Sequence, residues 1–298
     1  MRPCAVAFAM AATVTAAVAS QSACPQHYEA GQAPDIVKES LVSRLAEICH
    51  EGYGVLHSGV SATPLWSAER LTADRVRAAK GVDRVDVFHA EPGLPAADRA
   101  ELSHYKGSGF DRGHLAPAAD MATETSQDES FSLANMIPQV PELNRSLWAH
   151  VEATARGLAL AYGDVWVVTG VAFEGQGLRR IGGRVLVPSA VYKAVYVPSA
   201  NAAAAWWAPN AEPGTSYEVI SISELENRAG VDVFPGLDKA VRERGAKLPP
   251  PSAAADRISG PAPVRQPAAK AAKPAEGHSQ PSSVWGSIAR KAIKELLR

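Results

Sequence analysis

Long apolar runs are missing from this chain except near its beginning, so no other segment could span a membrane, and a permanent anchor near the beginning is the alternative to a cleaved segment. Met1-Arg2 is a short basic start, Ala5 to Val18 is apolar and rich in alanine, and Ala17-Val18-Ala19 has the small-x-small pattern of a cleavage site. The apolar run is shorter than the roughly 20 residues that a transmembrane helix needs. We therefore predict that residues 1–19 are a secretory signal peptide and that the mature protein is periplasmic or secreted.

Cysteine is also scarce, and the spacing of the cysteines excludes a structural zinc site. The chain has three, Cys4, Cys24 and Cys49, without the short paired spacing of zinc-binding cysteines. Removal of residues 1–19 would leave an even pair. In an exported chain an even pair predicts one disulfide, here between Cys24 and Cys49, and two free thiols are the alternative.

A broad excess of positive charge is absent. The formal net charge is −1 but unevenly spread: residues 249–298 carry eight basic and three acidic side chains, whereas residues 3–248 carry 21 and 28. The acidic body excludes a protein that coats nucleic acid through a wide positive field. Recognition of phosphate by the body must therefore depend on a few local arginines or on a metal ion.

Hydrophobic periodicity predicts a domain of mixed helices and strands over residues 20–248. Helical spacing is found at Val37–Ile48, Thr72–Lys80, Asn144–Tyr162 and Ile222–Ala229. Short apolar runs predict strands at Pro64–Arg70, Val165–Thr169, Val185–Val187, Tyr192–Val197, Ala203–Ala208 and Val231–Phe234. These elements do not alternate regularly, so the predicted fold class is α+β and not a doubly wound sheet.

Two segments of different composition follow this domain. Residues 249–283 are rich in proline, alanine, serine and lysine and cannot bury enough apolar surface to fold, which predicts a disordered linker. Residues 284–298 combine an apolar face with basic positions elsewhere, which predicts a basic amphipathic helix. Such a helix could contact a membrane surface or a protein.

The residues best suited to chemistry lie between Gly107 and Asn144, around Asp111-Arg112-Gly113-His114. An imidazole can take up a proton near neutral pH, and a guanidinium can bind phosphate oxygens through its planar fork. His114 is therefore the candidate general base that deprotonates an attacking water, and Arg112 is a candidate phosphate-binding residue. The structural alternative is a turn at Asp111 to Gly113 followed by a half-buried histidine.

Asn144 and Glu152 are the candidate metal-binding residues, because both belong to the helix predicted over Asn144–Tyr162. Eight residues apart, they differ by roughly 80° around the helix axis and can face one site. One amide and one carboxylate, without a cysteine or histidine cage, suit a hard cation that keeps several waters; Mg²⁺ fits, and Mn²⁺ or Ca²⁺ could enter. The alternatives are a helix N-cap for Asn144 and a solvated surface charge for Glu152. Asp111 is expected to orient or pair with a neighbour.

These residues resemble the sugar-non-specific DNA/RNA endonucleases, whose active site is a ββα-metal finger. The resemblance covers about residues 50–240 and rests on Asp111-Arg112-Gly113-His114 with Pro117, Phe131, Asn135-Met136-Ile137-Pro138-Gln139, Asn144, Trp148, Glu152, Val168-Thr169-Gly170, Val187-Pro188, Tyr192-Lys193 and Glu224-Leu225-Glu226 before Gly230. It implies a mixed or antiparallel central sheet flanked by helices. The active site would then be built on a ββα-metal finger.

The resemblance also implies roles for individual residues. His114 matches the family's general base, and Asn144 matches the direct metal ligand. Glu152 matches a residue that holds the metal's waters, and Arg112 one that supports the phosphate and the leaving group. Asn135 matches a polar residue that supports the site.

A second phosphate-binding arginine is expected in the polar, turn-rich segment Gly81–Asp98 or near it. Arg84 is the best match to the family at this position. The loop differs in length from that of the relatives, so Arg77 and Arg99 are alternatives.

The sequence thus predicts a Mg²⁺-dependent endonuclease for DNA and RNA that yields a 5′-phosphate and a 3′-hydroxyl. Because the nucleophile is water, the 2′-hydroxyl has no required part, and contacts to phosphate carry no sequence information. Two other functions stay open: an exported nucleic-acid- or envelope-binding protein that works through residues 284–298, and a phosphodiesterase for another substrate. The sequence does not indicate an oligomeric state.

Overall fold

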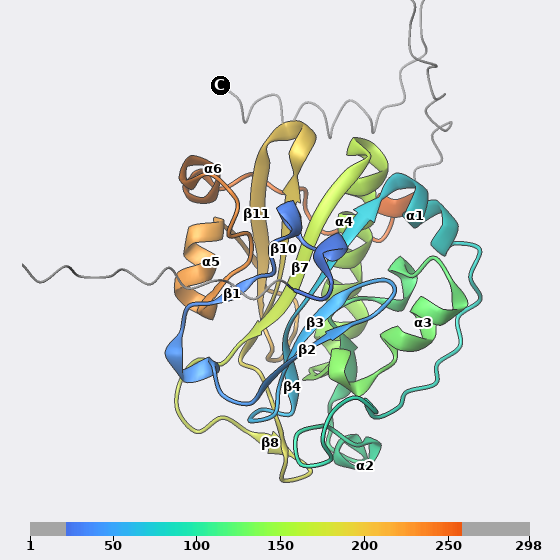
Figure 1. The fold of residues 1–298 in the computed structure, drawn as a ribbon, viewed down its shortest axis with the longest axis vertical. Helices are drawn as coiled ribbons and strands as arrows, with labels where there is room; N and C mark the ends of the chain where they lie inside the picture. The colour runs from blue at the N-terminus through green and yellow to red at the C-terminus, as the bar shows by residue number, and fades with distance from the viewer. Residues whose placement is uncertain (1–21, 258–298) are drawn as a thin grey trace, which may run out of the picture.

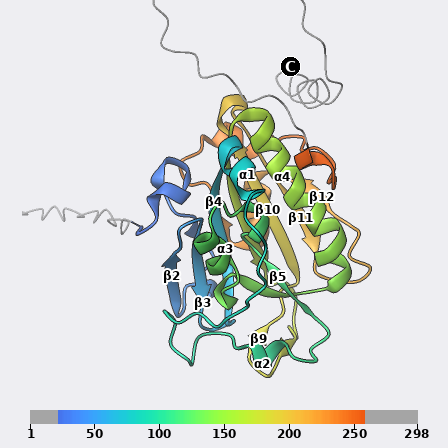
Figure 2. The same cartoon turned by 90° about the vertical axis from the view of Figure 1, so that its right-hand side faces the viewer.

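The computed structural model describes residues 22–257, which form an antiparallel sheet covered by helices on both faces (Figures 1 and 2). The seven strands lie in the order β12-β11-β10-β7-β4-β3-β2. Their bounds are β2 Leu45–Cys49, β3 Gly54–Ser58, β4 Thr63–Thr72, β7 Asp164–Ala172, β10 Ala190–Val197, β11 Ala202–Pro209 and β12 Glu218–Ile220. The predicted α+β class with a central sheet flanked by helices is confirmed.

The helices and the smaller strand pairs lie around this sheet. The helices are α1 Ala73–Ala79, α2 Leu102–Tyr105, α3 Glu124–Ser130, α4 Ala149–Tyr162, α5 Ile222–Ala229 and α6 Lys239–Arg244. A π-helix, η6, covers Leu143–Trp148 and leads directly into α4. The strand pairs are β1 Asp35–Ile36 with β13 Val231–Asp232, β5 Asp111–His114 with β6 Met136–Gln139, and β8 Arg180–Ile181 with β9 Val185–Leu186.

Alternation along the central strands gives the sheet two apolar faces, as expected for a sheet that is covered on both sides. On β10, Tyr192 packs into the cluster shared with α5, whereas Val191 packs into the cluster shared with α4. On β11, Trp207 and Trp206 divide in the same way, and both are buried. The helix α4 therefore rests on a rigid layer, which fixes the side chains that it directs away from the sheet.

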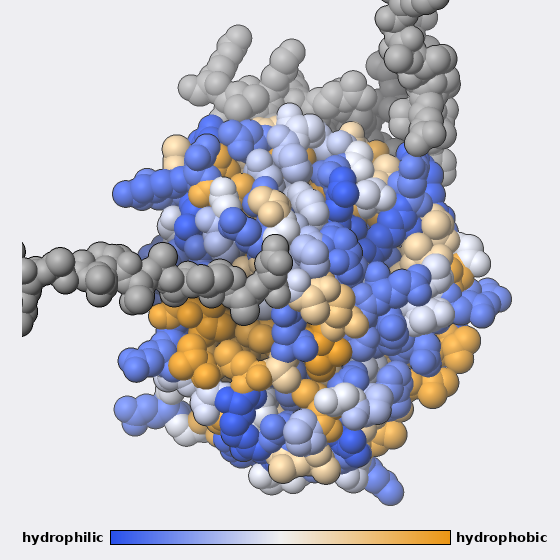
Figure 3. Space-filling model, viewed as in Figure 1, coloured by the Kyte–Doolittle hydropathy of each residue, from blue (hydrophilic) through white to orange (hydrophobic). Residues whose placement is uncertain are grey.

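The N-terminal segment differs from the sequence prediction. Helical spacing predicted a helix at Val37–Ile48, but the structure has only a short 3-10 turn at Glu39–Leu41 before the edge strand β2. Half-exposed apolar residues on an edge strand imitate the spacing of an amphipathic helix, and pairing of β2 with β3 decides the conformation. Val37 and Val42 of this segment are exposed. Figure 3 shows an apolar area on the left of the face that it draws.

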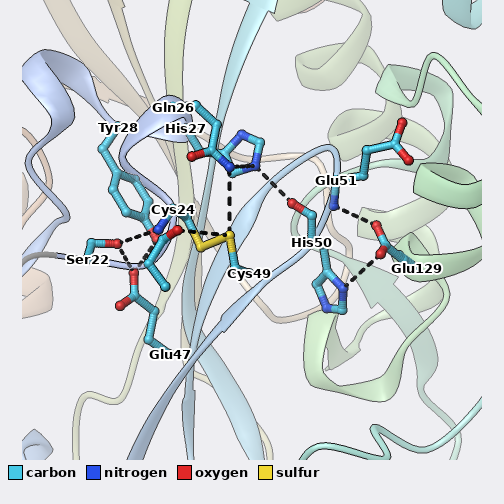
Figure 4. The surroundings of a disulfide bond; sticks show 11 residues. Ser22, Cys24, Gln26, His27, Tyr28, Glu47, Cys49, His50, Glu51 and Glu129 are labelled. Atoms are coloured by element: carbon cyan, nitrogen blue, oxygen red, sulfur yellow. Dashed lines mark hydrogen bonds and ion pairs between the residues drawn. A yellow bond between two sulfur atoms is a disulfide. The ribbon is translucent and has the colours of Figure 1, made fainter.

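A disulfide joins Cys24 to Cys49, as predicted, and ties the start of the described chain to the end of β2. Figure 4 shows that the same region continues toward α3, because His50 and Glu51 both face Glu129. The Glu51 backbone N–H donates to Glu129 Oε2 across 2.7 Å, and His50 Nδ1 lies 3.8 Å from Glu129 Oε1. The disulfide therefore fixes a strand end that contacts the segment before Phe131.

At the other end, the ordered chain continues past the boundary expected at residue 248. Residues 249–257 lie against α4 and end in the 3-10 turn η8, Ala255–Arg257, beside the upper part of α4 (Figures 1 and 2). Pro249 O accepts a hydrogen bond from Trp206 Nε1 across 3.3 Å. The predicted linker therefore differs from the structure over its first residues. The rest of the predicted linker, the predicted helix 284–298 and the predicted signal peptide 1–19 lie outside the described residues.

Across residues 22–257 no helix is long and apolar enough to cross a membrane.

Candidate active site

The cluster Asp111-Arg112-Gly113-His114 forms a strand, β5, and not the turn that was the structural alternative. It pairs with β6 in antiparallel register, with Asp111 opposite Gln139 and His114 opposite Met136. Gly113 is required by this pairing, because a Cβ there would lie 2.7 Å from the Cβ of Gln139. The two strands and the following helix η6–α4 make a β-β-α unit that places the charged side chains of β5 beside the start of the helix.

His114 sits among aromatic rings and has no hydrogen-bond partner for Nε2 within the described chain, although this atom is buried. The ring of Phe131 lies 5.1 Å from the imidazole, nearly perpendicular to it, and the ring of Phe88 lies 5.8 Å away. Burial, together with the positive charges of Arg84 and Arg112, lowers the pKa of His114 to about 3, and the negative charge of Asp86 acts in the opposite direction. His114 is therefore neutral at physiological pH and able to accept a proton.

Arg112 and Arg84 lie on the same aromatic rings as His114. The guanidinium carbon of Arg112 is 4.1 Å from the centre of the Phe88 ring, and that of Arg84 is 5.4 Å from the centre of the Phe131 ring. Arg112 Nε is buried without a hydrogen-bond partner in the described chain. Arg84 Nε donates to Asp86 Oδ1 across 2.6 Å. Two cations beside a neutral imidazole suit an anionic ligand such as a phosphodiester.

The structure separates the three candidates for a second phosphate-binding arginine. All three arginines pair with a nearby carboxylate: Arg77 with Asp74 across 2.9 Å, Arg99 with Glu101 across 2.7 Å, and Arg84 with Asp86 across 2.6 Å. Of the three, only Arg84 is among the charges that shift the pKa of His114 and of Glu152. The geometry therefore favours Arg84.

Asn144 is oriented by Asp111. Its Nδ2 donates to Asp111 Oδ2 across 3.0 Å, and Arg145 donates to both oxygens of the same carboxylate across 2.8 and 2.6 Å. Burial acts to raise the pKa of Asp111, but the hydrogen bonds from Arg145 and Asn144 outweigh it and hold this pKa below its usual value. With the amide nitrogen fixed on an ionised carboxylate, the amide oxygen of Asn144 is left to face another ligand.

The N-cap alternative for Asn144 is not what the structure has. Asn144 lies inside the π-helix η6, and the cap position before that helix is Glu142, which makes no side-chain cap bond. The π-helix also changes the relation between Asn144 and Glu152. Because its hydrogen bonds run from residue i to i+5, each residue turns the chain by less than the roughly 100° of an α-helix. The path from Asn144 to Trp148 lies in the π-helix and the rest of the path to Glu152 lies in α4. The total rotation therefore comes closer to two full turns than eight α-helical steps do, which predicts better alignment of the two side chains than regular helical spacing.

Glu152 is partly exposed and lies among several charges. Burial raises its pKa to about 7, the positive charges of Lys193, Arg156 and Arg84 act in the opposite direction, and Asp120 adds to the rise. A carboxyl group in such surroundings is not the solvated surface charge that was the alternative. It changes its charge near neutral pH, and a bound cation would favour its ionised form.

Asn135 supports the site from beneath. Its side chain is fully buried; Oδ1 accepts hydrogen bonds from Ser67 Oγ and from the Ala116 N–H, both across 2.9 Å, and Nδ2 donates to Ala116 O and Ser130 O. The Leu115 N–H donates to Asn135 O across 3.0 Å. These bonds hold the two residues after His114, so Asn135 positions β5 and does not face a substrate.

Two residues of the site were not identified as functional from the sequence. Phe88 lies in the polar segment Gly81–Asp98, which has no periodicity that could single it out. Lys193 is 1% exposed on β10, and its Nζ donates to Leu115 O across 3.4 Å and to Thr169 Oγ1. A lysine within the apolar run Tyr192–Val197 was the available signal, because an unpaired ammonium is not placed in a core.

The donor set fits a hard, partly hydrated cation. Residues 22–257 contain no group of three or more histidine, cysteine, aspartate or glutamate side chains that could hold a metal ion. What the structure offers instead is the amide of Asn144, oriented by Asp111, and the carboxylate of Glu152 on the helix that continues from η6. Mg²⁺ and related ions suit a site of this kind, in which the protein supplies few oxygen ligands and waters fill the remaining positions.

The fold and the site together define a phosphodiester-cleaving enzyme of the ββα-metal type. A family model described as DNA/RNA non-specific endonuclease matches residues 33–240, and the chain belongs to this family, whose members are metal-dependent nucleases. The chain is thus an endonuclease of that family.

Several known proteins are similar to this chain. Nuclease C1 of Cunninghamella echinulata var. echinulata is 36% identical over 208 residues, which are 63% of this chain and 82% of that protein. The mitochondrial nuclease EXOG of Danio rerio is 33% identical over 197 residues, 59% of this chain and 57% of that protein. A crystal structure of an EndoG/EndoGI complex matches with a TM-score of 0.60 and 27% identity over 65% of this chain and 88% of that chain.

The comparisons correct the predicted location. Relatives in Danio rerio, Schizosaccharomyces pombe, Homo sapiens and Saccharomyces cerevisiae are named as mitochondrial nucleases, so the prediction of a periplasmic or secreted protein is wrong. The physical reason lies in the N-terminal composition. Residues 1–20 contain one arginine, one serine and many small apolar residues but no acidic residue, and mitochondrial transit peptides are also poor in acidic residues.

Proposed function

We propose that this endonuclease hydrolyses phosphodiester bonds of both DNA and RNA with little sequence preference, using water activated by His114 and a bound Mg²⁺. One observation carries this proposal most directly. A neutral imidazole with a buried, unpartnered nitrogen lies at the end of the strand whose first residue, Asp111, orients the amide of Asn144. The general base and the metal ligand are thus held by the same four-residue strand.

His114 takes the proton of the attacking water in this mechanism. The water oxygen bonds to phosphorus as the bond from phosphorus to the 3′-oxygen breaks, and the 3′-oxygen takes a proton from solvent water, which leaves a 5′-phosphate and a 3′-hydroxyl. The low pKa of His114 keeps it unprotonated before substrate binds. An incoming phosphodiester carries a negative charge that offsets Arg84 and Arg112, so the pKa of His114 rises when proton transfer is needed.

Arg112 and Arg84 bind the non-bridging oxygens and support the leaving group. Their positions over Phe88 and Phe131 limit side-chain motion, so less conformational entropy is lost when the phosphate binds. None of these groups reads a base edge or a 2′-hydroxyl, which is why we propose slight sequence preference and activity on both nucleic acids.

Asn144 would hold the cation directly through its amide oxygen, and Glu152 would hold the cation's waters. When bound, Mg²⁺ supplies positive charge that stabilises the oxygens of the scissile phosphate and the leaving group, and Mn²⁺ is a possible substitute. Asp111 and Asn135 act as positioning residues for Asn144 and for β5.

A comparison of His114→Ala with His150→Ala tests this mechanism. His150 is on α4, two positions before Glu152, and therefore points away from it by roughly 200° around the axis. On plasmid DNA and on RNA in Mg²⁺, His114→Ala should lower kcat by about 10²- to 10⁴-fold, and His150→Ala should change it little. Full cleavage by His114→Ala, or full activity of the wild type in EDTA, would contradict the proposal.

A further inference from the structure

A pocket lies beside the proposed active site, between α1, the loop after it, the 3-10 turn Ala118–Asp120 and α4. Its polar lining includes Lys80, Arg84, Gln127, Arg156 and Asp256, and Val76 and Ala79 form part of its apolar lining. Three cations in one pocket are notable in a body with an overall acidic balance. Arg84 belongs to both the pocket and the surroundings of His114, so the two sites are contiguous.

The only carboxylate of this lining within the described residues, Asp256, comes from the segment 249–257. This segment lies beyond residue 240, where the match to the endonuclease family ends. Its backbone is fixed to α4, because the Ser252 N–H donates to Thr154 Oγ1 across 2.9 Å. It also approaches Gly157 so closely that a Cβ there would lie 2.6 Å from Ala255 O.

Asp256 engages two of the three cations. Its Oδ2 accepts a hydrogen bond from Arg156 Nε across 2.8 Å, and its backbone oxygen accepts one from Lys80 Nζ across 2.7 Å. Arg156 also donates to Asp120 Oδ1 across 2.8 Å, so two carboxylates neutralise a guanidinium that is 8% exposed. Asp120 is a buried structural partner of Arg156, whereas Asp256 is half-buried at the end of the described chain.

We propose that this pocket binds a second phosphate of the nucleic-acid strand, next to the one that is cleaved, and that Asp256 occupies the same position in the free protein. A carboxylate and a phosphate oxygen accept the same hydrogen bonds from Arg156 and compete for the same positive charge. The segment 249–257 is therefore an internal competitor that weakens binding of strands long enough to reach the pocket. This inference rests on the proposed nuclease function, because it names a further part of the substrate site.

The experiment measures binding separately from cleavage. Asp256→Asn and the control Asp238→Asn are each made in the His114→Ala background, and the Kd of a fluorescent single-stranded 20-nucleotide DNA is measured by anisotropy in EDTA. Asp238 is an exposed aspartate before α6 without a side-chain cap bond, so its variant makes the same change of charge elsewhere. Asp256→Asn should lower Kd about fivefold relative to the control, as expected for one displaced charge contact. Lys80→Gln should raise it.

Substrate length gives a second readout in the otherwise wild-type enzyme. With the 20-nucleotide strand, Asp256→Asn should lower KM and leave kcat unchanged, whereas with a dinucleotide that has a single phosphodiester both parameters should stay as they are. An equal Kd for Asp256→Asn and Asp238→Asn overturns the inference, as does a fall in kcat with unchanged Kd, which would mean that Asp256 only orients Arg156. Failure of the nuclease proposal would appear differently, as absence of cleavage by the wild type.

Discussion

Asn144 donates the hydrogen bond from its Nδ2 to Asp111 Oδ2 across 3.0 Å, so the first residue of β5 sets the orientation of the amide at the start of the long helix. An asparagine side chain can present either its oxygen or its nitrogen in a given direction, and only the oxygen binds a cation. The ionised carboxylate of Asp111 accepts from the nitrogen and thereby decides which end faces the site. Partners of metal ligands commonly have this effect on affinity.

Replacement of Asp111 by alanine should therefore weaken metal binding without removing a ligand. We expect Asp111→Ala to raise the Mg²⁺ concentration for half-maximal cleavage by about 10- to 100-fold, with much of kcat restored at saturating Mg²⁺. Arg145→Gln is the control, since Arg145 binds the same carboxylate but is 71% exposed and does not contact the amide in this way. A Mg²⁺ titration that superimposes on that of the wild type would show that Asp111 does not set the orientation.

Glu152 is predicted to lower the stability of the metal-free protein at alkaline pH. Its pKa is about 7 in the folded protein against 4.5 for the free side chain, so the folded state binds a proton more tightly and unfolding releases it between these values. The contribution of Glu152 to the free energy of unfolding is therefore fully present below pH 4.5, and it is lost as the pH rises through 7. Glu152→Gln should be more stable than wild type at pH 8 by about 1 to 3 kcal/mol, since one pKa unit corresponds to about 1.4 kcal/mol and the group is partly exposed.

Urea unfolding in EDTA at pH 8 and at pH 4.5 checks this prediction. The gain of Glu152→Gln should be confined to pH 8, while Glu174→Gln, a change of an exposed loop glutamate, should show no gain at either pH. A gain of equal size at both pH values would mean that the ionisation of Glu152 is not its origin. The same Glu152→Gln variant should lose activity in Mg²⁺. Together the two results would show that Glu152 is needed for activity although it lowers the stability of the metal-free protein.

Asn135→Ala should reduce stability and activity together. The substitution leaves the N–H and carbonyl of Ala116, the carbonyl of Ser130 and the hydroxyl of Ser67 without a partner in a fully buried place. Each buried polar group left unpaired costs about 1 to 3 kcal/mol, so a loss of about 3 kcal/mol or more is expected by chemical denaturation. Asn227→Ala, on the exposed side of α5, should cost far less. Equal losses for the two variants would refute a supporting role for Asn135.

Phe88→Leu should lower the rate by weakening the position of Arg112. Leucine fills most of the volume but lacks the π-face on which the guanidinium lies at 4.1 Å, a contact worth about 0.5 to 2 kcal/mol. We therefore expect kcat/KM to fall by roughly 2- to 30-fold, with the thermal midpoint little changed. Phe110→Leu removes the contact of Arg179 with Phe110 and serves as the matched control. Similar kcat/KM values for the two variants would argue against a specific role of Phe88.

Local patterns predicted the elements whose environment is uniform along their length. The runs around Val167, Val195 and Ala205 became central strands because they are buried on both faces, and Leu158 and its helical neighbours became α4 because one stripe meets the sheet. The misassigned segment, Val37–Ile48, is an edge region whose conformation is set by pairing with β3. The four-residue strand β5 was not predicted, because it contains charged residues and a glycine, which are uncommon in strands. It forms a strand through its pairing with β6, in which Asp111 lies opposite Gln139.

Residues of the candidate site could be predicted from the sequence where the side-chain type and spacing single them out. They could not be predicted where only the folded position of an ordinary side chain gives it a role. His114, Asn144 and Glu152 are unusual side chains at distinctive spacings, whereas Phe88 is an ordinary aromatic residue in a polar loop until the chain folds it over Arg112. Asp256 lies in a segment whose composition predicts disorder, yet a glycine at 157 creates the space in which its backbone docks. A fit between two segments that are distant in the sequence produces no hydrophobic periodicity in either segment, so sequence patterns cannot predict it.

The π-helix η6 gives the active site a particular sensitivity to chain length. A π-helix contains more residues per turn than an α-helix, and loss of one residue between Leu143 and Trp148 would return the segment to ordinary helical winding. The backbone would become more regular and the helix more stable, but Asn144 would rotate away from both Asp111 and Glu152. We therefore expect the π-helix to lower the stability of this helix and to bring the side chains of Asn144 and Glu152 closer to alignment. A one-residue deletion variant with a raised thermal midpoint and no Mg²⁺-dependent activity would show it.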